Sequence, residues 1–395
     1  MNKQLGLVYK KGVLAATLSR QGGNIKFQYD DAYLASGGQP VATTLPLTSE
    51  PLLLSGSTAP AYFAGLLPEG RRLNAISDRL KTSLSDDLGL LLEIGADLIG
   101  DVQVLAPDAN PATERESLML PSDLAEISFS EIRERFKGAK PTGIPGVQDK
   151  LSSKMLNARA RMANVDYMLK LNPTDVPFAV ENEAYFLGLA KKCGIKVANH
   201  KLLIDGQGQP ALLLERFDRI ATKQGKQLLA AEDGCQVANL YPADKYNIDF
   251  LQMAKGLASL CPASMVAGYE IFKQLVFNWL IGNGDAHAKN FSVLESDSGE
   301  WRVSPAYDLL CTRYYEDRTM ALAINELTTN WSRSLLVEAA GELGVSRKAA
   351  EAVITEQLAT LADLPDQIIS GALPFRRDQN YDVAAFLKQR AKALD

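Results

Sequence analysis

The sequence is poor in the residues from which disulfide frameworks and metal centres are built. Its four cysteines are scattered without paired spacing, which predicts reduced thiols rather than a disulfide frame or a zinc site. It has two histidines, His200 and His287, and these are too few for a histidine-rich metal centre. Disulfide-rich secreted proteins and zinc-centred domains are therefore disfavoured.

Long apolar runs and an excess of positive charge are also lacking. No run approaches the roughly 18 apolar residues of a membrane-spanning helix, and residues 1–20 lack the apolar core of a signal peptide. The formal net charge of −5 argues against a surface that binds nucleic acid by itself, although a local basic face is compatible with it. We expect a soluble, cytoplasmic protein with no membrane partner.

What is present is enough material for two or three packed units. The chain has 395 residues, of which 46% are hydrophobic and 23% are charged, as in ordinary globular proteins. Short alternating segments near the start, separated by glycines, predict a small antiparallel β unit with strands at residues 5–9, 13–18 and 25–29. A helix is expected at 71–82, and a linker rich in proline, alanine and charge begins near residue 106.

The middle of the chain predicts a second small sheet with one helix against it. The helix is expected at 182–193, ending at Gly194, and the strands at residues 150–156, 167–171, 201–204 and 211–217. Beyond about residue 235 helices dominate. One of them has an apolar face that repeats at helical spacing and ends at Gly282, and others are expected at 334–364 and 383–394.

The segment Gly-Asp-Ala-His-Ala-Lys-Asn-Phe-Ser at residues 284–292 carries the strongest chemical signal. It places Asp285 and Asn290 five residues apart, directly after the apolar helix. Phosphoryl transfer needs a carboxylate to accept the proton of the attacking hydroxyl and an oxygen ligand for Mg²⁺, and the kinase catalytic loop has the same Asp-to-Asn separation. A hairpin at 291–303 then leads to Asp308, where kinases keep a second metal ligand.

A lone match of this kind often arises by chance, so other interpretations of the segment stay open. Asp285 and His287 could be two metal ligands of a hydrolase, but that site would need further histidines. We interpret His287 instead as a loop-shaping residue beside the aspartate. Lys289 either stays near the transferred phosphate, which we favour, or is solvated.

Lys170 is an isolated lysine in an otherwise apolar strand. Burying its ammonium group is unfavourable unless it pairs with a phosphate or a carboxylate. Glu183, on the following helix, is the expected partner, as in the strand-lysine to helix-glutamate pair of kinases. The alternative is an edge-strand lysine that faces solvent.

Two further segments fit the same order along the chain. The glycine-containing stretch from Gly143 to Lys150 could let backbone amides approach phosphates, although most such runs are plain turns. Glu215-Arg-Phe-Asp-Arg219 stands where a kinase hinge contacts adenine, and by itself it could equally be a surface salt-bridge cluster. The kinase interpretation rests on the order of all these features, since none of them compels it alone.

The sequence therefore predicts an α+β, two-lobed, protein-kinase-like fold with a small antiparallel β lobe and a helical C-terminal lobe. An extra β-rich N-terminal subdomain precedes the two lobes. The expected boundaries are 1–106 for this subdomain, 107–139 for a linker or helical connection, 140–234 for the ATP-binding lobe and 235–395 for the helical lobe.

Across most of its length the sequence resembles the HipA family of toxin–antitoxin kinases. The specific string is Asp-x-His-x-Lys-Asn-Phe-Ser at 285–292. The other segments that carry the resemblance are the Phe-Ala-Gly-Leu-Leu-Pro-Glu-Gly-Arg of 63–71, Gly-Val-Gln-Asp-Lys of 146–150, Leu-Lys-Leu of 169–171, residues 215–219 and Pro-Ala-Tyr-Asp of 305–308.

The resemblance implies a role for each matching residue. Asp285 becomes the catalytic base, assisted by Lys289 and Asn290, and Asn290 and Asp308 become Mg²⁺ ligands. ATP would be bound by the phosphate loop, the strand lysine and its partner, and the pocket residues, namely Gly146, Val147, Gln148, Lys150, Lys170, Glu183, Glu215, Phe217, His287 and Tyr307.

The resemblance also implies a biological setting. Family members phosphorylate serine or threonine on a protein, characteristically the glutamyl type of aminoacyl-tRNA synthetase, which arrests growth and favours persistence. Their partner is a small helix-turn-helix antitoxin, HipB, through which operator DNA is bound.

One departure from the family pattern concerns self-inactivation. Members carry serine just before the phosphate-loop glycine and phosphorylate it, but Gly143 and Pro145 stand there and Thr142 is the nearest hydroxyl. Two other functions are kept open: a small-molecule kinase of the aminoglycoside or choline type, and a non-catalytic corepressor that binds an antitoxin.

Overall fold

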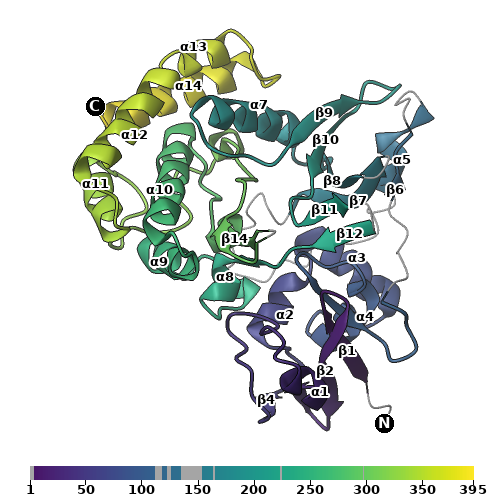
Figure 1. Ribbon diagram of the computed structural model, residues 1–395. Helices are drawn as coiled ribbons and strands as arrows, with labels where there is room; N and C mark the ends of the chain where they lie inside the picture. Colours follow the sequence, from purple (N-terminus) through teal and green to yellow (C-terminus); the bar gives the residue numbers. More distant parts are fainter. Residues whose placement is uncertain are drawn as a thin grey trace.

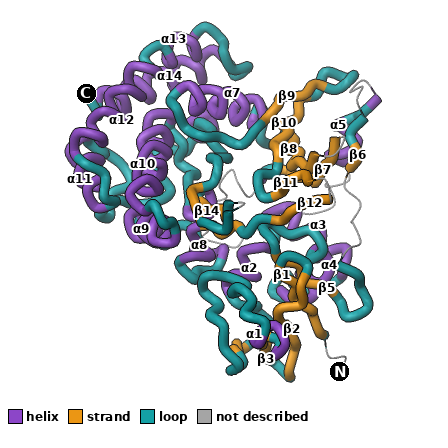
Figure 2. The backbone as a smooth tube through the Cα atoms, in the orientation of Figure 1, coloured by secondary structure: helices purple, strands orange, loops and turns teal. Residues whose placement is uncertain are grey.

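The computed structural model of the protein describes residues 4–111, 118–121, 126–134, 154–162, 165–222, 225–296 and 298–395. Three parts meet near the middle of the molecule: an N-terminal unit, a small sheet and a large helical part (Figure 1). The tube in Figure 2 shows most of the strands in the first two parts and most of the helices in the third. No helix in these ranges is long and apolar enough to cross a membrane.

The N-terminal unit is a five-stranded antiparallel sheet in the order β4-β3-β2-β1-β5. Its strands are β1 (Leu5–Lys10), β2 (Val13–Gln21), β3 (Asn24–Tyr29), β4 (Leu52–Ser55) and β5 (Val102–Leu105). Alternate residues of β1 and β3 are buried, as the alternating sequence predicts. The three strands expected here are confirmed, and the other two lie beyond them in the chain.

This unit is also more helical than expected. Its helices are α1 (Asp31–Ala35), α2 (Ala61–Leu66), α3 (Gly70–Leu80) and α4 (Asp87–Ile94). Helix α3 was expected, but α2 and α4 are short and apolar on nearly every side, so they carry no helical periodicity. Phe63, Leu88 and Leu91 place these two helices inside the core beneath the sheet.

The second sheet has the order β6-β7-β8-β10-β9, with β6 (Leu118–Met119) parallel to its neighbour and the other pairs antiparallel. Its other strands are β7 (Leu156–Met162), β8 (Val165–Leu171), β9 (His200–Ile204) and β10 (Pro210–Glu215). Helix α7 (Ala179–Lys192) packs on one face of this sheet, and Phe129 and Ile132 of α5 (Phe129–Glu134) pack on the other. Lys170 on β8 faces Asn157 on one side and Leu212 on the other, so it belongs to a central strand and not to an edge.

The strand expected at 150–156 is wrongly placed. Strand β7 begins where that segment ends, at Leu156, and residues 150–153 lie outside the described part of the chain. The true strand contains Arg159 and Arg161, whose charges hid it from an apolar pattern. Both arginines are held by carboxylates.

The remaining chain is mostly helical, with two small sheets at its border. One sheet pairs β11 (Arg219–Thr222) with β12 (Gly225–Leu228), and the other joins β13 (Ala231–Asp233), β14 (Ser292–Glu295) and β15 (Trp301–Val303). The helices are α8 (Gly234–Val237), α9 (Phe250–Leu260), α10 (Ser264–Ile281), α11 (Arg333–Glu342), α12 (Arg347–Thr360), α13 (Leu364–Ile369) and α14 (Arg377–Lys392). Short 3₁₀ turns are η2 (Pro242–Asp244), η3 (Ala288–Asn290) and η4 (Thr312–Tyr315).

Helix α10 is the centre of the helical part. From Ala267 onward it is buried on nearly every turn, and Phe272, Val276 and Phe277 are among its fully buried side chains. It ends at Gly282, whose φ of +70° is favourable only for glycine, and this sharp end directs the chain into the loop that carries Asp285. The rigid helix thereby fixes where the loop begins.

We expect Gly268→Ala to destabilise the protein, because a Cβ at this position of α10 would lie 2.3 Å from the carbonyl oxygen of Leu343. The backbone must shift to relieve this contact, at a cost of about 1–3 kcal/mol. Gly188→Ala in α7 is the matched control, since a Cβ there meets nothing within 4 Å. That variant should gain roughly 0.5–1 kcal/mol from helix propensity. Denaturant unfolding of both variants measures the difference, and equal stabilities would contradict the packing of α10 against Leu343.

Candidate active site

A buried lysine on β8 is held by carboxylates from two other elements. The ammonium nitrogen of Lys170 lies 2.8 Å from each carboxylate oxygen of Glu183 on α7. It also contacts the carboxylate of Asp308, which follows β15 in the chain. Lys170 and Glu183 are 6% and 1% exposed, so neither charge could persist there alone. The predicted pair is present, and the solvent-facing alternative is wrong.

The electrostatics of this cluster keep the lysine charged. Burial alone would lower the pKa of Lys170, but Asp308 and Glu183 together hold that pKa above its ordinary value. Burial raises the pKa of Glu183 against the opposing effect of Lys170, and Asp308 adds to the rise. Lys170 is therefore a charged lysine between two carboxylates, and it lines a cavity together with Asp308.

Asp308 is fixed from three directions. Its backbone N–H donates to Glu183 Oε1 at 3.1 Å, and its carbonyl oxygen accepts from Asn283 Nδ2 at 3.0 Å. Its Oδ2 accepts from Asn290 Nδ2 at 3.0 Å. The residue has φ of +55°, in the left-handed region that aspartate tolerates better than most side chains, and these contacts hold it there.

Residues 283–291 form the candidate catalytic loop. Asp285 is buried, and its Oδ1 accepts a hydrogen bond of 2.8 Å from the hydroxyl of Tyr246. The backbone carbonyl of Asp285 accepts from the N–H of His287, and the carbonyl of His287 accepts from the N–H of Asn290. The His287 ring meets the Tyr246 ring edge-on at 5.2 Å. The backbone of His287 thus forms part of the turn between Asp285 and Asn290, and burial, with Lys245, lowers the pKa of its ring well below the ordinary value.

The oxygen atoms at the Asp308 side of the loop suit Mg²⁺. Among the described residues, the buried Oδ1 of Asn290 has no hydrogen-bond donor, and it belongs to the side chain whose Nδ2 reaches Asp308. Carboxylate and amide oxygens are hard ligands, and Mg²⁺ is commonly held by one or two of them together with substrate phosphates. The described residues contain no group of three or more His, Cys, Asp or Glu side chains that could hold a metal. The donor set thus fits Mg²⁺ held with a nucleotide, and it does not fit a histidine-based hydrolase centre.

Lys289 is directed toward the N-terminal unit. Its ammonium nitrogen donates to the carbonyl oxygen of Gly65 at 2.8 Å and lies 3.2 Å from Glu69 and 3.7 Å from Asp233. Burial alone would lower the pKa of Lys289, but Glu69 and Asp233 raise it above its ordinary value. Lys289 is therefore not solvated, and in this structure it is neutralised by carboxylates.

A cavity of about 310 Å³ opens beside Lys170 and Asp308, within the range of small-molecule sites. Its lining includes five of the residues expected around ATP, namely Lys170, Glu215, Phe217, His287 and Tyr307. The Tyr307 hydroxyl donates to the carbonyl of Lys289 at 2.7 Å, and its ring lies 5.9 Å from that of Phe217. The N-terminal unit supplies part of the wall through residues to which the sequence analysis assigned no role in binding, among them Leu66, Glu69, Arg72 and Ile99.

The expected phosphate loop cannot be compared with this geometry. Gly146, Val147, Gln148 and Lys150 lie outside the described residues, as do Thr142, Gly143 and Pro145. Glu183 and Asn290 are not in the cavity lining, and they reach it through Lys170 and Asp308.

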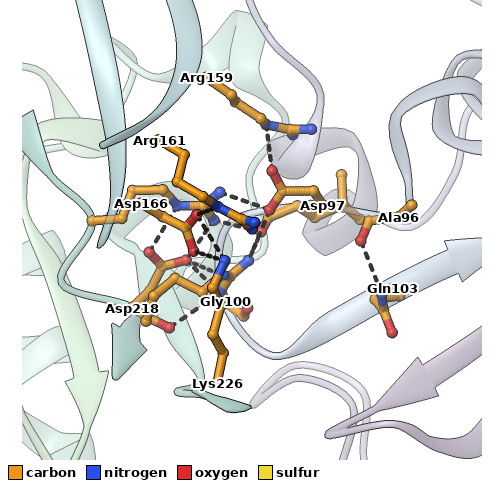
Figure 3. A network of polar contacts seen from close by, with 12 residues as sticks. Ala96, Asp97, Gly100, Gln103, Arg159, Arg161, Asp166, Asp218 and Lys226 are labelled. Carbon is orange, nitrogen blue, oxygen red and sulfur yellow. Dashed lines mark hydrogen bonds and ion pairs between the residues drawn. The ribbon is translucent and has the colours of Figure 1, made fainter. Parts of the chain in front are cut away.

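The segment Glu215–Arg219 contributes both to the cavity and to a network of ion pairs. Glu215 and Phe217 line the cavity, while Arg216, Asp218 and Arg219 form a charge network that is buried rather than on the surface (Figure 3).

The centre of this network is Asp97, in the turn between α4 and β5. Arg216 and Arg159 approach its carboxylate at 2.7 and 3.1 Å, and Arg219 at 3.2 Å. Asp218 accepts a hydrogen bond of 2.8 Å from the backbone N–H of Gly100. The segment after β10 thus binds the N-terminal unit through an acid as well as through its arginines. Beside it in Figure 3, Asp166 joins Arg161 and Lys226.

Sequence reasoning missed Asp97, Tyr246 and Glu69. Asp97 and Tyr246 are single polar residues outside any motif-like string, and their partners lie far away in the chain. Glu69 lies within the 63–71 segment that carries the resemblance, but its lysine partners are also far away, and the resemblance gave it no role.

Two family models match this chain. The HipA N-terminal domain matches residues 6–105, and the HipA-like C-terminal domain matches residues 142–364. The chain belongs to the HipA family. The resemblance noted in the sequence is thereby confirmed.

Individual HipA relatives agree with this assignment. The chain is 29% identical over 339 residues to Y4mE of Sinorhizobium fredii, covering 78% of this chain and 77% of that protein. It is 26% identical over 315 residues to the serine/threonine-protein kinase toxin HipA of Shewanella oneidensis, covering 73% and 71% of the two chains.

A solved structure of Shewanella oneidensis MR-1 HipA, in complex with HipB and operator DNA, has the same fold. It superposes with a TM-score of 0.73 at 22% identity, covering 98% of this chain and 96% of that one. The α+β, two-lobed, kinase-like fold with an additional N-terminal unit is confirmed.

We expect Asp97→Asn to loosen the N-terminal unit, because it leaves three arginines without their shared carboxylate. Breaking such a pair by removing one partner costs about 3 kcal/mol. Burial alone would raise the pKa of Asp97, but Arg216, Arg159 and Arg219 hold it below its ordinary value. The stabilisation of the fold by ionised Asp97 is therefore complete above about pH 4 and is lost as the pH falls further. In thermal unfolding, the unfolding temperature of the variant should lie well below that of the wild type at pH 7 and closer to it at pH 3.

The control for this substitution is Asp108→Asn, which changes an exposed carboxylate near the end of the same unit. It should leave the unfolding temperature unchanged at both pH values. If the unfolding temperature of Asp97→Asn falls no further than that of this control, the arginine network does not stabilise the fold.

Proposed function

We propose that this protein is an ATP-dependent kinase that phosphorylates serine or threonine on a protein. The observation that carries the proposal is the contact of Lys170 with both Glu183 and Asp308 beside a cavity of nucleotide size. A charged lysine next to a carboxylate and an amide oxygen matches the groups that bind ATP phosphates and Mg²⁺ in kinases. The name of the Shewanella relative, a serine/threonine-protein kinase toxin, supports the class of acceptor.

In this proposal each residue has one task. Lys170 binds the ATP phosphates, and its contact with Asp308 gives way when they enter. Asn290 and Asp308 hold Mg²⁺, which neutralises charge on the transferred phosphoryl group. Asp285, oriented by Tyr246, accepts the proton of the attacking hydroxyl. Glu215, Phe217 and Tyr307 enclose the adenine ring.

The proposal extends to the parts of the chain and to partners. Residues 1–106 would act as an accessory unit, 107–139 as a connection, 140–234 as the nucleotide lobe and 235–395 as the catalytic lobe. Because the Shewanella protein is solved with HipB and operator DNA, a HipB-like helix-turn-helix partner is proposed here too. With a net charge of −5, the chain would contact DNA mainly through that partner. An aminoacyl-tRNA synthetase, of the glutamyl type by resemblance, is the proposed substrate, and growth arrest is the proposed outcome.

We expect phosphate transfer from radiolabelled ATP with Mg²⁺ to a discrete protein band of a bacterial lysate. Asp285→Asn should reduce the label by roughly 10²- to 10⁴-fold, the usual contribution of a general base, while ATP binding is retained. Asp308→Asn should lose the part of ATP binding that depends on Mg²⁺, because it removes one charged ligand.

Asp108→Asn, an exposed acid remote from the cavity lining, should label the lysate as strongly as wild type. ATP binding without label on any protein would reject the protein-kinase proposal. Turnover of small alcohols or amines would then indicate a small-molecule kinase, and complete inactivity would indicate a corepressor.

A further inference from the structure

Glu69 of the N-terminal unit lies at the start of α3 but does not cap that helix. It occupies the N-cap position, yet its side chain makes no hydrogen bond to the first turn. Its carboxylate instead crosses to the helical part of the molecule. One oxygen contacts the ammonium group of Lys245 and the other lies 3.2 Å from that of Lys289.

The surroundings of these two lysines make Glu69 their shared acid. Lys245 and Lys289 are 8% and 14% exposed, so both charges are largely removed from water. Asp233 stands 3.7 Å from Lys289, which balances two cations with two carboxylates. Burial alone would raise the pKa of Glu69, but Lys289 and Lys245 lower it to about 2, so this acid stays ionised at physiological pH.

Both lysines lie next to the groups proposed for chemistry. The backbone carbonyl of Lys245 accepts the N–H of Ala288 at 3.1 Å, and the following residue, Tyr246, donates to Asp285. Lys289 directly precedes Asn290, and its carbonyl accepts the hydroxyl of Tyr307. One carboxylate thus holds both flanks of the catalytic loop, one through Lys245 and Tyr246 and the other through Lys289.

We propose that Glu69 is a positioning residue, through which the N-terminal unit holds Asp285 and Asn290 in their working arrangement. The inference rests on the proposed kinase function and deepens it, because it makes the N-terminal unit a regulator of the same site. Undocking of this unit releases Lys245 and Lys289 and disorganises the loop. Glu69 touches neither of the two loop residues that it controls.

The chain offers a matched control two residues away. Arg71 also crosses between the N-terminal unit and the rest of the molecule, where it pairs with Asp175 at 2.6 Å. Asp175 lies between β8 and α7, outside the catalytic loop and the cavity lining. Arg71→Gln therefore breaks an ion pair across the same boundary without touching the loop.

The test compares MgATP turnover of the full-length protein with that of Glu69→Gln, Lys245→Met, their combination and Arg71→Gln. Turnover is measured as phosphate released or transferred. Displacement of catalytic groups by about 1 Å can cost 10²-fold, so we expect kcat of Glu69→Gln to fall roughly 10- to 100-fold. KM for ATP should change less than kcat, because Glu69, although part of the cavity wall, contacts neither Lys170 nor Asp308, the groups proposed to hold the phosphates and Mg²⁺.

The other variants separate positioning from a general loss of stability. Lys245→Met should also lower kcat, and the double variant should be no worse than Glu69→Gln, since the Glu69–Lys245 contact that Lys245→Met removes is already absent in Glu69→Gln. The double variant removes one negative and one positive charge. It can therefore be used for the test if Glu69→Gln alone does not fold. Arg71→Gln should retain wild-type kcat. Unchanged kcat in the Glu69 variants, or an equal loss in Arg71→Gln, would overturn the inference.

Hydrogen exchange distinguishes this failure from failure of the kinase proposal. Amides of residues 283–291 should exchange faster in Glu69→Gln than in wild type, and Arg71→Gln should match wild type there. If the wild-type protein turns over no ATP, the proposed function fails, and the exchange comparison still decides whether Glu69 organises the loop. Unchanged exchange in that segment would overturn the inference by itself.

Discussion

The structure depends on the burial of one ammonium group on a central strand. Lys170 can stay inside only because Glu183 and Asp308 reach it, and these acids come from a helix and from a segment more than 130 residues further along. Satisfying one charge therefore joins the small sheet, helix α7 and the end of the hairpin that follows the catalytic loop. The backbone of Asp308 is bound in turn to Glu183 and Asn283, so the nucleotide side and the catalytic side of the cavity form one connected unit.

The N-terminal unit is joined to this core by the same principle. Asp97 meets Arg159 of the second sheet and Arg216 and Arg219 of the segment that follows β10, and Glu69 meets two lysines of the helical part. Charges that are largely buried at a boundary are stable only when the boundary is closed. The unit also supplies part of the cavity wall. Its docking is therefore coupled to the site, which distinguishes it from a domain attached by a flexible linker.

The sequence predicted what depends on local order and missed what depends on distant contacts. A lysine in an apolar strand requires a partner, and the strand-lysine to helix-glutamate pattern of kinases identified Glu183 on the next helix as that partner. The helix before Asp285 and its end at Gly282 followed from periodicity and backbone conformation. Lys289 could not be placed in this way, because its partner Glu69 is 220 residues earlier in the chain. Strand β7 was misplaced for a related reason: its arginines look exposed until Asp97 is brought beside them.

Lys170 and Lys289 have different partners, and these partners give the two lysines different roles. Lys170 contacts Asp308, a third of whose side chain is exposed, and this contact can be exchanged for a phosphate because both groups line the cavity. Lys289 is enclosed by Glu69, Asp233 and the Gly65 carbonyl, and giving up these contacts would separate Asp233 from this cation and leave Glu69 paired with Lys245 alone. The charge that can move toward a nucleotide is thus the one on β8. Lys289, which the sequence analysis expected near the transferred phosphate, lines the cavity and links the catalytic loop to the N-terminal unit in this structure.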